Sequence, residues 1–402
     1  MRVEELRIRN FRNIEDCVLF PASQLNFLVG LNGQGKTSFL EAISYLSTLR
    51  SFRNSKSEDA IQWGKQEAEV SCSLKKEEWK SRLRIKFSAG NEQGEKNSKT
   101  AFVNEKPCKS ATLYLHQRFG SSQLGFHSVT FNPSDHELVN GDPSVRRGYL
   151  DSVLIAEEMD YIEVLRKYQR VLKQKNALLK DPRAEKGRPV SLFDFNESLA
   201  RYGSLLTFRR LLWIRRLQKI VNDAARLISL KQAPLNIFYY SSWVSETENL
   251  VIHNKELKVR HFTGQEVVPS LKMLETSFLK ALSAFEQLEM KVRTSLVGPH
   301  RDDWGLWIGE RKLKAVGSQG EVRTALLALK ISEIELFREK TGCLPVFLLD
   351  DFSSELDQER RKFLLNFFSK TDLQAFITST EDSLEGGTKH FISDGRLREF
   401  FT

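Results

Sequence analysis

Apolar and polar residues alternate near the start of the chain and then change to a helical spacing. Residues 3 to 9 and 24 to 29 follow the two-residue period of strands. From Thr37 to Leu49 the apolar residues recur every three or four positions, which predicts a helix with one apolar stripe. A glycine-rich segment lies between the second strand and this helix. The pattern therefore predicts a strand, a glycine turn and a helix in succession.

The middle of the chain changes character twice. Short alternating runs between residues 61 and 115, such as 69 to 74 and 82 to 87, predict antiparallel strands, and the polar stretch 89 to 100 predicts a hairpin loop. Helical spacing follows over 152 to 179 and 193 to 228, interrupted by prolines and a glycine. Neither stretch keeps a long seven-residue repeat, so we expect a compact helical arm rather than an extended coiled coil.

The last third predicts the return of a sheet. A helix is expected near 270 to 290, and strands are expected over the apolar run 345 to 349 and over 374 to 378. These late strands belong with the early ones, because residues 1 to 50 alone cannot complete a nucleotide-binding fold. The expected division is an N-terminal part at 1–150, a helical and basic lobe at 151–290 and a C-terminal part at 291–402 of the same head.

Composition and charge narrow the class of protein. The chain has 402 residues, 40% of them hydrophobic and 28% charged, which is typical of a globular protein of two or three domains. Its formal charge is +9, and residues 161 to 231 hold 17 Lys or Arg against 6 Asp or Glu, so this segment carries +11 and the remainder −2. A regional excess of this kind favours a nucleic-acid partner, although a solvated helix face gives the same pattern.

Other classes fit the sequence poorly. The apolar run 346 to 349 is far shorter than the roughly 20 residues of a membrane helix, and the first residues lack the apolar stretch of a signal peptide. Four cysteines without a C-x-x-C pair argue against a disulfide framework or a zinc site. We therefore expect a cytoplasmic protein with no membrane partner.

The glycine-rich segment matches the phosphate-binding loop G-x-x-x-x-G-K-[ST] in full and lies between a predicted strand and a predicted helix. Glycines let the backbone N–H groups point at a phosphate, Lys36 reaches the terminal phosphates and Thr37 offers a hydroxyl to Mg²⁺. A glycine turn with a chance lysine is the weaker interpretation. The sequence predicts binding of ATP or GTP through Gly30, Leu31, Asn32, Gly33, Gln34, Gly35, Lys36, Thr37 and Ser38.

An apolar strand that ends in two carboxylates is the natural partner of this loop. Asp350 is expected to hold the Mg²⁺ shell. By strand alternation Asp351 points the other way, where it can orient or deprotonate an attacking water. The alternative is a pair of helix-capping aspartates after a core strand. We predict catalytic roles for Lys36, Asp350 and Asp351.

Two weaker motifs flank the acidic strand. The segment Ser318, Gln319 and Gly320 begins a predicted helix, and in an ABC-type ATPase such a helix start meets the γ-phosphate held by a second subunit. Ser354 and Asp357 follow the acidic strand where these ATPases have a loop that crosses the dimer interface. A simple N-cap with an acidic first turn is the alternative.

One further motif suggests a site from its residue types alone. The segment 298 to 303 contains His300 with Asp302 and Asp303, which could bind a metal or serve as acid and base. Only seven histidines occur in the chain and none is spaced as H-x-x-x-H, so a metallohydrolase has little other support. We expect a structural turn.

The set and order of these motifs resembles the RecF family of bacterial DNA-repair ATPases, which is related to SMC and Rad50 heads. The resemblance rests on N-F-R-N at 10–13, G-Q-G-K-T at 33–37, L-E-A-I at 40–43, R-S-F-R at 50–53 and F-x-P-x-D at 131–135. It continues in G-x-P-x-x-R-R at 141–147, the long run 168–179, G-P-H-R-D-D at 298–303, S-Q-G at 318–320 and L-L-D-D at 348–351. The chain differs from the family pattern at Ser134 and Glu321, and its strand 376 to 380 lacks a switch histidine.

This resemblance implies the fold and the activity together. The implied fold is an α/β ABC-type P-loop ATPase head, with a mixed sheet, flanking helices, an antiparallel β sub-lobe and a helical insertion lobe. Arg12 would join the nucleotide site. ATP with Mg²⁺ would pair two copies, and weak hydrolysis linked to DNA would release them. Family members bind duplex and gapped DNA, act with RecO and RecR to load RecA in repair and replication, and support the SOS response.

Three rival functions and one residue set remain open at this point. The rivals are the nucleotide-binding subunit of a membrane transporter, an SMC-like defence nuclease and, more distantly, a small-molecule P-loop kinase. Basic pairs at helical spacing in the arm are our candidates for contacts to DNA phosphates, with a solvated face or a protein-binding surface as the alternative. These residues are Arg209, Arg210, Arg215 and Arg216.

Overall fold

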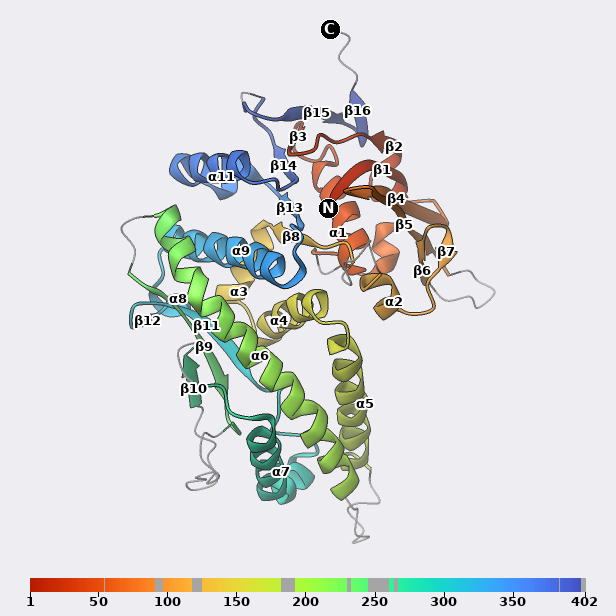
Figure 1. Cartoon of the computed structure of the whole chain (residues 1–402). Coiled ribbons are helices and arrows are strands. Elements are labelled where there is room, and N and C mark those ends of the chain that lie inside the picture. The colour runs from red at the N-terminus through yellow and green to blue at the C-terminus, as the bar shows by residue number, and fades with distance from the viewer. Residues whose placement is uncertain are drawn as a thin grey trace. The chain divides into compact units, whose positions relative to one another are not determined.

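The computed structural model describes residues 1–53, 55–90, 97–117, 125–181, 192–229, 233–244, 260–263, 267–382 and 384–398. The chain forms two compact units (Figure 1). Unit 1 comprises Met1–Asp135, Leu227–Leu230 and Leu326–Thr402, and unit 2 comprises His136–Arg226 and Lys231–Ala325. Each unit is therefore built from segments distant in sequence. The sequence-based boundaries at residues 150 and 290 stay a prediction.

A largely parallel sheet forms the centre of unit 1. Its order is β16-β15-β3-β14-β13-β8, and the five strands from β15 to β8 run parallel. The late strands pair with the first ones, as the sequence predicted. Both faces are covered, which explains why the central strands are apolar almost throughout. The bounds are β3 Leu25–Val29, β8 Ser128–Phe131, β13 Val346–Leu349, β14 Ala375–Ser379, β15 Thr388–Ser393 and β16 Arg396–Arg398.

The second sheet of unit 1 is antiparallel, which confirms the β sub-lobe. Its order is β2-β1-β4-β5-β6-β7. The predicted hairpin loop falls between β5 and β6, and residues 91–96 of it lie outside the described residues. The bounds are β1 Arg2–Phe11, β2 Ile14–Leu19, β4 Glu67–Lys76, β5 Trp79–Ser88, β6 Ser98–Val103 and β7 Lys106–Pro107.

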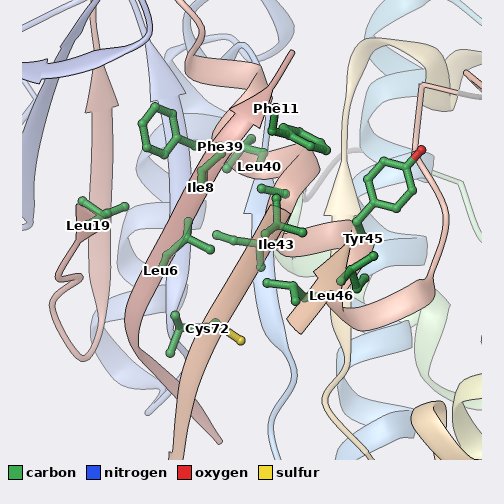
Figure 2. Close-up of a cluster of buried hydrophobic side chains, with 14 of the residues drawn as sticks. Leu6, Ile8, Phe11, Leu19, Phe39, Leu40, Ile43, Tyr45, Leu46 and Cys72 are labelled. Atoms are coloured by element: carbon green, nitrogen blue, oxygen red, sulfur yellow. The ribbon is translucent and has the colours of Figure 1, made fainter. Parts of the chain in front are cut away.

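Helix α1 (Lys36–Thr48) packs against the antiparallel sheet and supplies the core of unit 1. Figure 2 shows Leu40 and Ile43 of α1 among Leu6 and Ile8 of β1. Each such buried side chain contributes about 1.5–3 kcal/mol to folding. The helix ends at Thr48, because Leu49 takes a left-handed conformation with φ 57°. The other helices of unit 1 are η1 Ser57–Ala60, α2 Ala111–Leu115, α10 Phe352–Glu355 and α11 Gln358–Lys370, and η2 Pro133–His136 reaches the unit boundary.

Unit 2 combines long helices with a four-stranded sheet of order β10-β9-β11-β12. Helix α6 ends, and helix α9 continues, in unit 1. The helices are α3 Glu137–Asn140, α4 Pro143–Glu157, α5 Tyr161–Leu179, α6 Phe193–Ile228, α7 Leu271–Val292, α8 Leu313–Val316 and α9 Gln319–Thr341. The strands are β9 Leu235–Ser241, β10 Arg260–Thr263, β11 Asp303–Ile308 and β12 Arg311–Lys312.

The helical stretch predicted over 152 to 179 is wrong in one respect, because two helices occupy it. Glu158 has extended backbone angles, and Tyr161 N–H donates to its carbonyl in a turn between α4 and α5. Arg209 of α6 forms ion pairs with both Glu158 and Asp160 and so binds the turn. The apolar spacing continues across the break, so the periodicity alone could not reveal it.

Candidate nucleotide-binding site

The glycine loop joins β3 to α1 in the geometry that its sequence predicted. Gly35 caps α1 with φ 103°, a left-handed conformation that favours glycine. A Cβ at this position would lie 2.8 Å from the side-chain amide nitrogen of Asn13. Asn13 also accepts a hydrogen bond from Ser38 Oγ at 2.9 Å. Asn13 therefore braces the loop from the neighbouring sheet, a role that the sequence did not reveal.

Lys36 lies at the bottom of this loop with its ammonium group folded back on the loop itself. Its Nζ donates to the carbonyl oxygens of Gly30 at 2.7 Å and Leu31 at 2.8 Å. Burial lowers the pKa of Lys36, and the nearby charges of Asp350 and Asp351 oppose that shift. Backbone carbonyls are weak competitors for an ammonium compared with phosphate oxygens, so this cation is ready to turn to a triphosphate.

Asp350 meets the loop through two hydroxyl groups. Thr37 Oγ1 donates to its Oδ1 at 2.9 Å, and Thr378 Oγ1 of β14 donates to the same atom at 2.7 Å. Burial raises the pKa of Asp350, and these two hydrogen bonds oppose the shift. A carboxylate and a hydroxyl side by side are the oxygen ligands that Mg²⁺ uses with a nucleotide. The residues present therefore fit the expected metal.

Asp351 is not where strand alternation placed it. Strand β13 ends at Leu349, and Asp351 has φ 58° as the N-cap residue of α10. Its N–H donates to Thr378 Oγ1 at 2.8 Å. Because the backbone leaves the strand conformation here, Asp350 and Asp351 line the same cavity rather than opposite sides of the sheet. Thr378, to which the sequence pattern assigned no role, contacts both aspartates.

These residues surround a cavity of about 780 Å³ within unit 1. Ligand pockets commonly measure about 300–1,000 Å³, so the space suits a nucleotide. Asp350 and Asp351 line it together with Lys36, which lies 314 positions before Asp350 in the chain. The cavity is also lined by Arg12, Asn13, Asn32, Gly33, Gly35, Thr37, Ser38, Arg53, Glu58, Asp59, Ile61, Trp63, Pro133 and Thr378.

Glu41 of α1 organises the arginine wall of this cavity. Its side chain is fully buried and accepts from Arg12 Nε at 2.9 Å and Nη2 at 2.5 Å. Ser51 Oγ also donates to it, and Arg53 lies 3.8 Å away. A lone buried carboxylate is unfavourable, so these donors are required. The sequence contains the signal, a glutamate among the apolar positions of α1, although sequence reasoning assigned it no role.

The two motifs expected at a dimer interface lie outside the cavity. Ser318 Oγ accepts from Glu321 N–H at 3.2 Å while the Glu321 carboxylate accepts from Ser318 N–H at 2.8 Å, which is a capping box for α9. The Ser318 hydroxyl also donates to the Glu321 carboxylate at 3.0 Å, and the hydrogen bonds from the Ser318 N–H and hydroxyl lower the pKa of Glu321. Ser318 and Gln319 are exposed. Ser354 is also exposed, and Asp357 caps α11 through Arg360 N–H at 3.0 Å.

The four arginines of α6 divide into bound and exposed residues. Arg210 is 3% exposed and donates to Asp151 Oδ1 at 2.7 Å and to the Pro299 carbonyl at 2.8 Å. Its assignment as a DNA contact is corrected, since a guanidinium buried among its own partners cannot reach a phosphate. Arg209 and Arg216 are half-buried in ion pairs with acidic residues, and Arg215 is exposed.

The turn at 298 to 303 is part of the core of unit 2. Asp302 accepts from Tyr239 Oη at 2.8 Å, Ser241 Oγ at 2.9 Å and Trp243 Nε1 at 3.1 Å. Burial raises the pKa of Asp302 to about 6. His300 Nδ1 lies 2.6 Å from Tyr168 Oη, and burial lowers its pKa to about 4. Neutral donors satisfy the carboxylate, as expected for a structural turn.

In the part of the chain from residue 1 to 398 that the structure describes, no helix is long and apolar enough to cross a membrane. The same residues contain no group of three or more His, Cys, Asp or Glu placed to bind a metal ion.

Comparison with known proteins points to one group. Residues 2–392 match the family model described as the RecF/RecN/SMC N-terminal domain. A DNA replication and repair protein RecF from Geotalea daltonii is 31% identical over 99% of this chain and 100% of its own length. The protein of the same name from Pediococcus pentosaceus is 32% identical over 98% of this chain and 96% of its own length.

Solved structures agree with the sequence relatives. The structure of the recombination mediator protein RecF with ATP, in the RecFOR pathway, has a TM-score of 0.84 and 30% identity, covering 99% of this chain and 97% of that chain. A Smc head domain from Pyrococcus furiosus has a TM-score of 0.51 and 13% identity, covering 98% and 95%. The latter likeness concerns the fold alone, which is the ABC-type ATPase head that the sequence predicted.

Proposed function

Because this chain belongs to the RecF family of DNA replication and repair proteins, we propose that it is a DNA-binding protein that ATP switches between a paired and a separate state. One observation carries the proposal: Asp350, 313 residues away in sequence, accepts a hydrogen bond from the phosphate-loop hydroxyl of Thr37 at 2.9 Å. This joins the acidic strand and the loop into one site. The main function is repair and replication rather than transport or nuclease activity.

The residues of unit 1 divide the work of holding ATP. The N–H groups of the loop and the start of α1 receive the phosphates, and Lys36 exchanges its two carbonyl partners for phosphate oxygens. Thr37 and Asp350 would hold Mg²⁺, which when bound neutralises charge on the phosphates. Arg12, oriented by Glu41, supplies a further positive group at the cavity wall.

Asp351 is our candidate for activating the water that hydrolyses ATP. It lines the cavity with Lys36, and its carboxylate accepts neither of the hydroxyl hydrogen bonds from Thr37 and Thr378, both of which go to Asp350 Oδ1. Thr378 positions both aspartates, since its hydroxyl donates to Asp350 and accepts from the backbone of Asp351. A carboxylate in this place can orient a water and accept its proton as the γ-phosphoryl group departs.

Pairing of two copies would complete each site. Ser318 and Gln319 are exposed at the start of α9 in unit 2 and are not among the residues that line the cavity of unit 1. Together with Gly320 they would meet the γ-phosphate held by a second copy. Ser354 and Asp357 would lie at the same interface. Hydrolysis removes the γ-phosphate, so the contact that it supports is lost and the pair opens.

The ATP-dependent pairing would serve DNA repair. The paired state would bind duplex or gapped DNA, act with RecR and RecO and help to load RecA onto single strands. The protein would work in the cytoplasm as a weak ATPase, with hydrolysis serving as a conformational switch. Support of the SOS response follows from RecA loading.

Sedimentation velocity tests the proposal directly. We expect a monomer without nucleotide or with ADP, and a dimer with ATP and Mg²⁺, strengthened by gapped duplex because each ligand favours the same state. Omitting Mg²⁺ should weaken pairing. A monomer at saturating ATP with Mg²⁺ and DNA would contradict the switch, while ATP binding without pairing would leave only the nucleotide site.

Trp63 provides a built-in reporter for the nucleotide. Its indole is 99% exposed although it lines the cavity, and its backbone is held where Gln62 N–H donates to the Asn10 carbonyl at 2.8 Å. We expect ATP to change the tryptophan fluorescence, because the ring exchanges water for ligand.

Trp63→Phe should remove most of that fluorescence change. Trp79→Phe is the matched control, since Trp79 is 58% exposed on β5 and does not line the cavity. Titration of all three proteins with ATP makes the comparison. An equal signal from Trp63→Phe and the unchanged protein would show that Trp63 does not sense the nucleotide.

A further inference from the structure

Helix α5 presents a strip of cations on the side opposite to its buried face. The residues that face the core include Tyr161, Val164, Tyr168 and Leu179. At 100° per residue, four exposed cations lie within about 80° of one another on the other side and extend over about 21 Å. We call these Arg166, Arg170, Lys173 and Lys180 the α5 strip. Figure 1 shows α5 at one edge of unit 2.

The charge of this helix is one-sided. Between residues 161 and 180 the chain has six Lys or Arg and only Glu163 as an acidic residue. The sixth cation, Lys175, is buried in an ion pair with Glu289 and takes no part in the strip. A helix face that serves only solubility usually mixes both signs. The excess of one sign indicates a partner of the other sign.

The strip differs from α6 in how its charges are used. Arg209, Arg210 and Arg216 of α6 each form an ion pair with a carboxylate. By contrast, among the described residues no carboxylate lies within ion-pair distance of any member of the α5 strip. The Nζ of Lys167, beside the strip, lies 5.9 Å from the centre of the Tyr202 ring. Three of the four α6 arginines singled out from the sequence are thus paired with carboxylates, and Arg215 is exposed, whereas all four cations of the α5 strip are available.

Amide groups flank the strip. Gln169 and Asn176 line a hollow of about 450 Å³ together with Leu172, Lys173, Ala177 and Lys180. Ser295 N–H donates to Asn176 Oδ1 at 2.8 Å, which leaves the NH2 of this side chain as a donor. The strip is thus a line of cations flanked by amide groups that can donate hydrogen bonds. Lys and Arg side chains have no hydrogen-bond acceptor, and such cations with neutral donors beside them are the groups with which DNA-binding proteins contact phosphates.

We propose that the α5 strip is a surface of unit 2 that binds the phosphate backbone of duplex DNA without reading its sequence. The inference rests on the proposed function, since it identifies where the DNA of that function is held. No aromatic residue lies on the strip to stack on unpaired bases, so a duplex suits it better than a single strand. Affinity should therefore be alike for duplexes of different sequence.

The test compares two variants, one that lacks three charges of the strip and one that lacks three charges of another helix. The strip variant is Arg166→Gln, Arg170→Gln, Lys173→Gln. The control is Lys272→Gln, Lys280→Gln, Lys291→Gln, which takes three exposed lysines from α7 of the same unit and changes the net charge equally. Glutamine is a good helix former, so both should fold. Circular dichroism and ATP affinity check this.

Duplex affinity is measured with ATP and Mg²⁺ at salt concentrations from about 50 to about 200 mM, the range in which contacts to phosphates make the affinity depend strongly on salt. The strip variant should bind at least about tenfold more weakly, and its log–log salt slope should be shallower by about 2.7, or 0.9 per lost contact. The control should bind like the unchanged protein.

Two results would overturn the inference. One is unchanged duplex affinity in the strip variant, which would leave the strip to an acidic protein partner. The other is an equal loss in the α7 control, which would show that net charge matters and position does not. Failure of the unchanged protein to bind duplex at all would instead contradict the proposed function.

Discussion

Asp351→Asn is expected to slow ATP hydrolysis by about two to four orders of magnitude while ATP affinity stays within a few-fold. The amide keeps the size of the side chain but cannot accept the proton of the attacking water. Asparagine tolerates the left-handed backbone of this position, where φ is 58°, so the local fold should survive. The variant should accumulate as an ATP-bound dimer, because the step that opens the pair is lost.

Steady-state phosphate release measures the rate of ATP hydrolysis, and gel filtration with ATP measures the accumulation of the dimer. Asp16→Asn is the matched control, since Asp16 is an exposed carboxylate of β2 in the same unit and does not line the cavity. It should leave both readouts unchanged. Normal turnover in Asp351→Asn would exclude Asp351 from catalysis and would turn attention to a water held by backbone groups.

Lys36→Ala is expected to weaken ATP binding by about 30- to 5,000-fold, which corresponds to about 2–5 kcal/mol for removing one member of a buried charge contact. The loss should be large because the ammonium is the cation that projects from the phosphate loop itself. Alanine begins a helix well, and the two carbonyls that Lys36 now contacts can be hydrated, so the fold should persist.

Isothermal titration with ATP and Mg²⁺ measures this loss, and the melting temperature checks the fold. Lys370→Ala, an exposed lysine at the end of α11, is the matched control. Lys36→Arg adds a second comparison, since a planar guanidinium cannot replace a compact ammonium and should bind ATP without supporting the dimer cycle. Full ATP affinity in Lys36→Ala would place the nucleotide elsewhere.

Several features could be predicted from sequence because they are local. The glycine loop, α1 and the apolar strand that precedes Asp350 depend on the order of neighbouring residues, and the structure has them where the pattern placed them. The pairing of β14 with β3 was also predicted, since a parallel sheet needs partners for its first strands. The break between α4 and α5 was missed because apolar spacing continues across it.

The site shows the same division at the level of single residues. The residue types of Lys36, Thr37 and Asp350 predicted a site for phosphates and Mg²⁺. Thr378 and Asn13 gave no such signal, because a threonine in a strand and an asparagine in a turn occur everywhere. Their roles arise from contacts across more than 20 residues of sequence, to Asp350 in one case and to Ser38 in the other.

The sequence by itself determined which chemical groups are present: a phosphate-loop motif, a strand followed by two carboxylates and a positively charged insertion can all be read from the order of residues. Tertiary structure alone decided which charges can act. The sequence alone does not distinguish Arg210 from the cations of the α5 strip. In the structure, Arg210 is buried against Asp151, while the strip is exposed to solvent. The physical reason is that the availability of a charge depends on the counter-charges and the solvent around it, and folding brings those from distant parts of the chain.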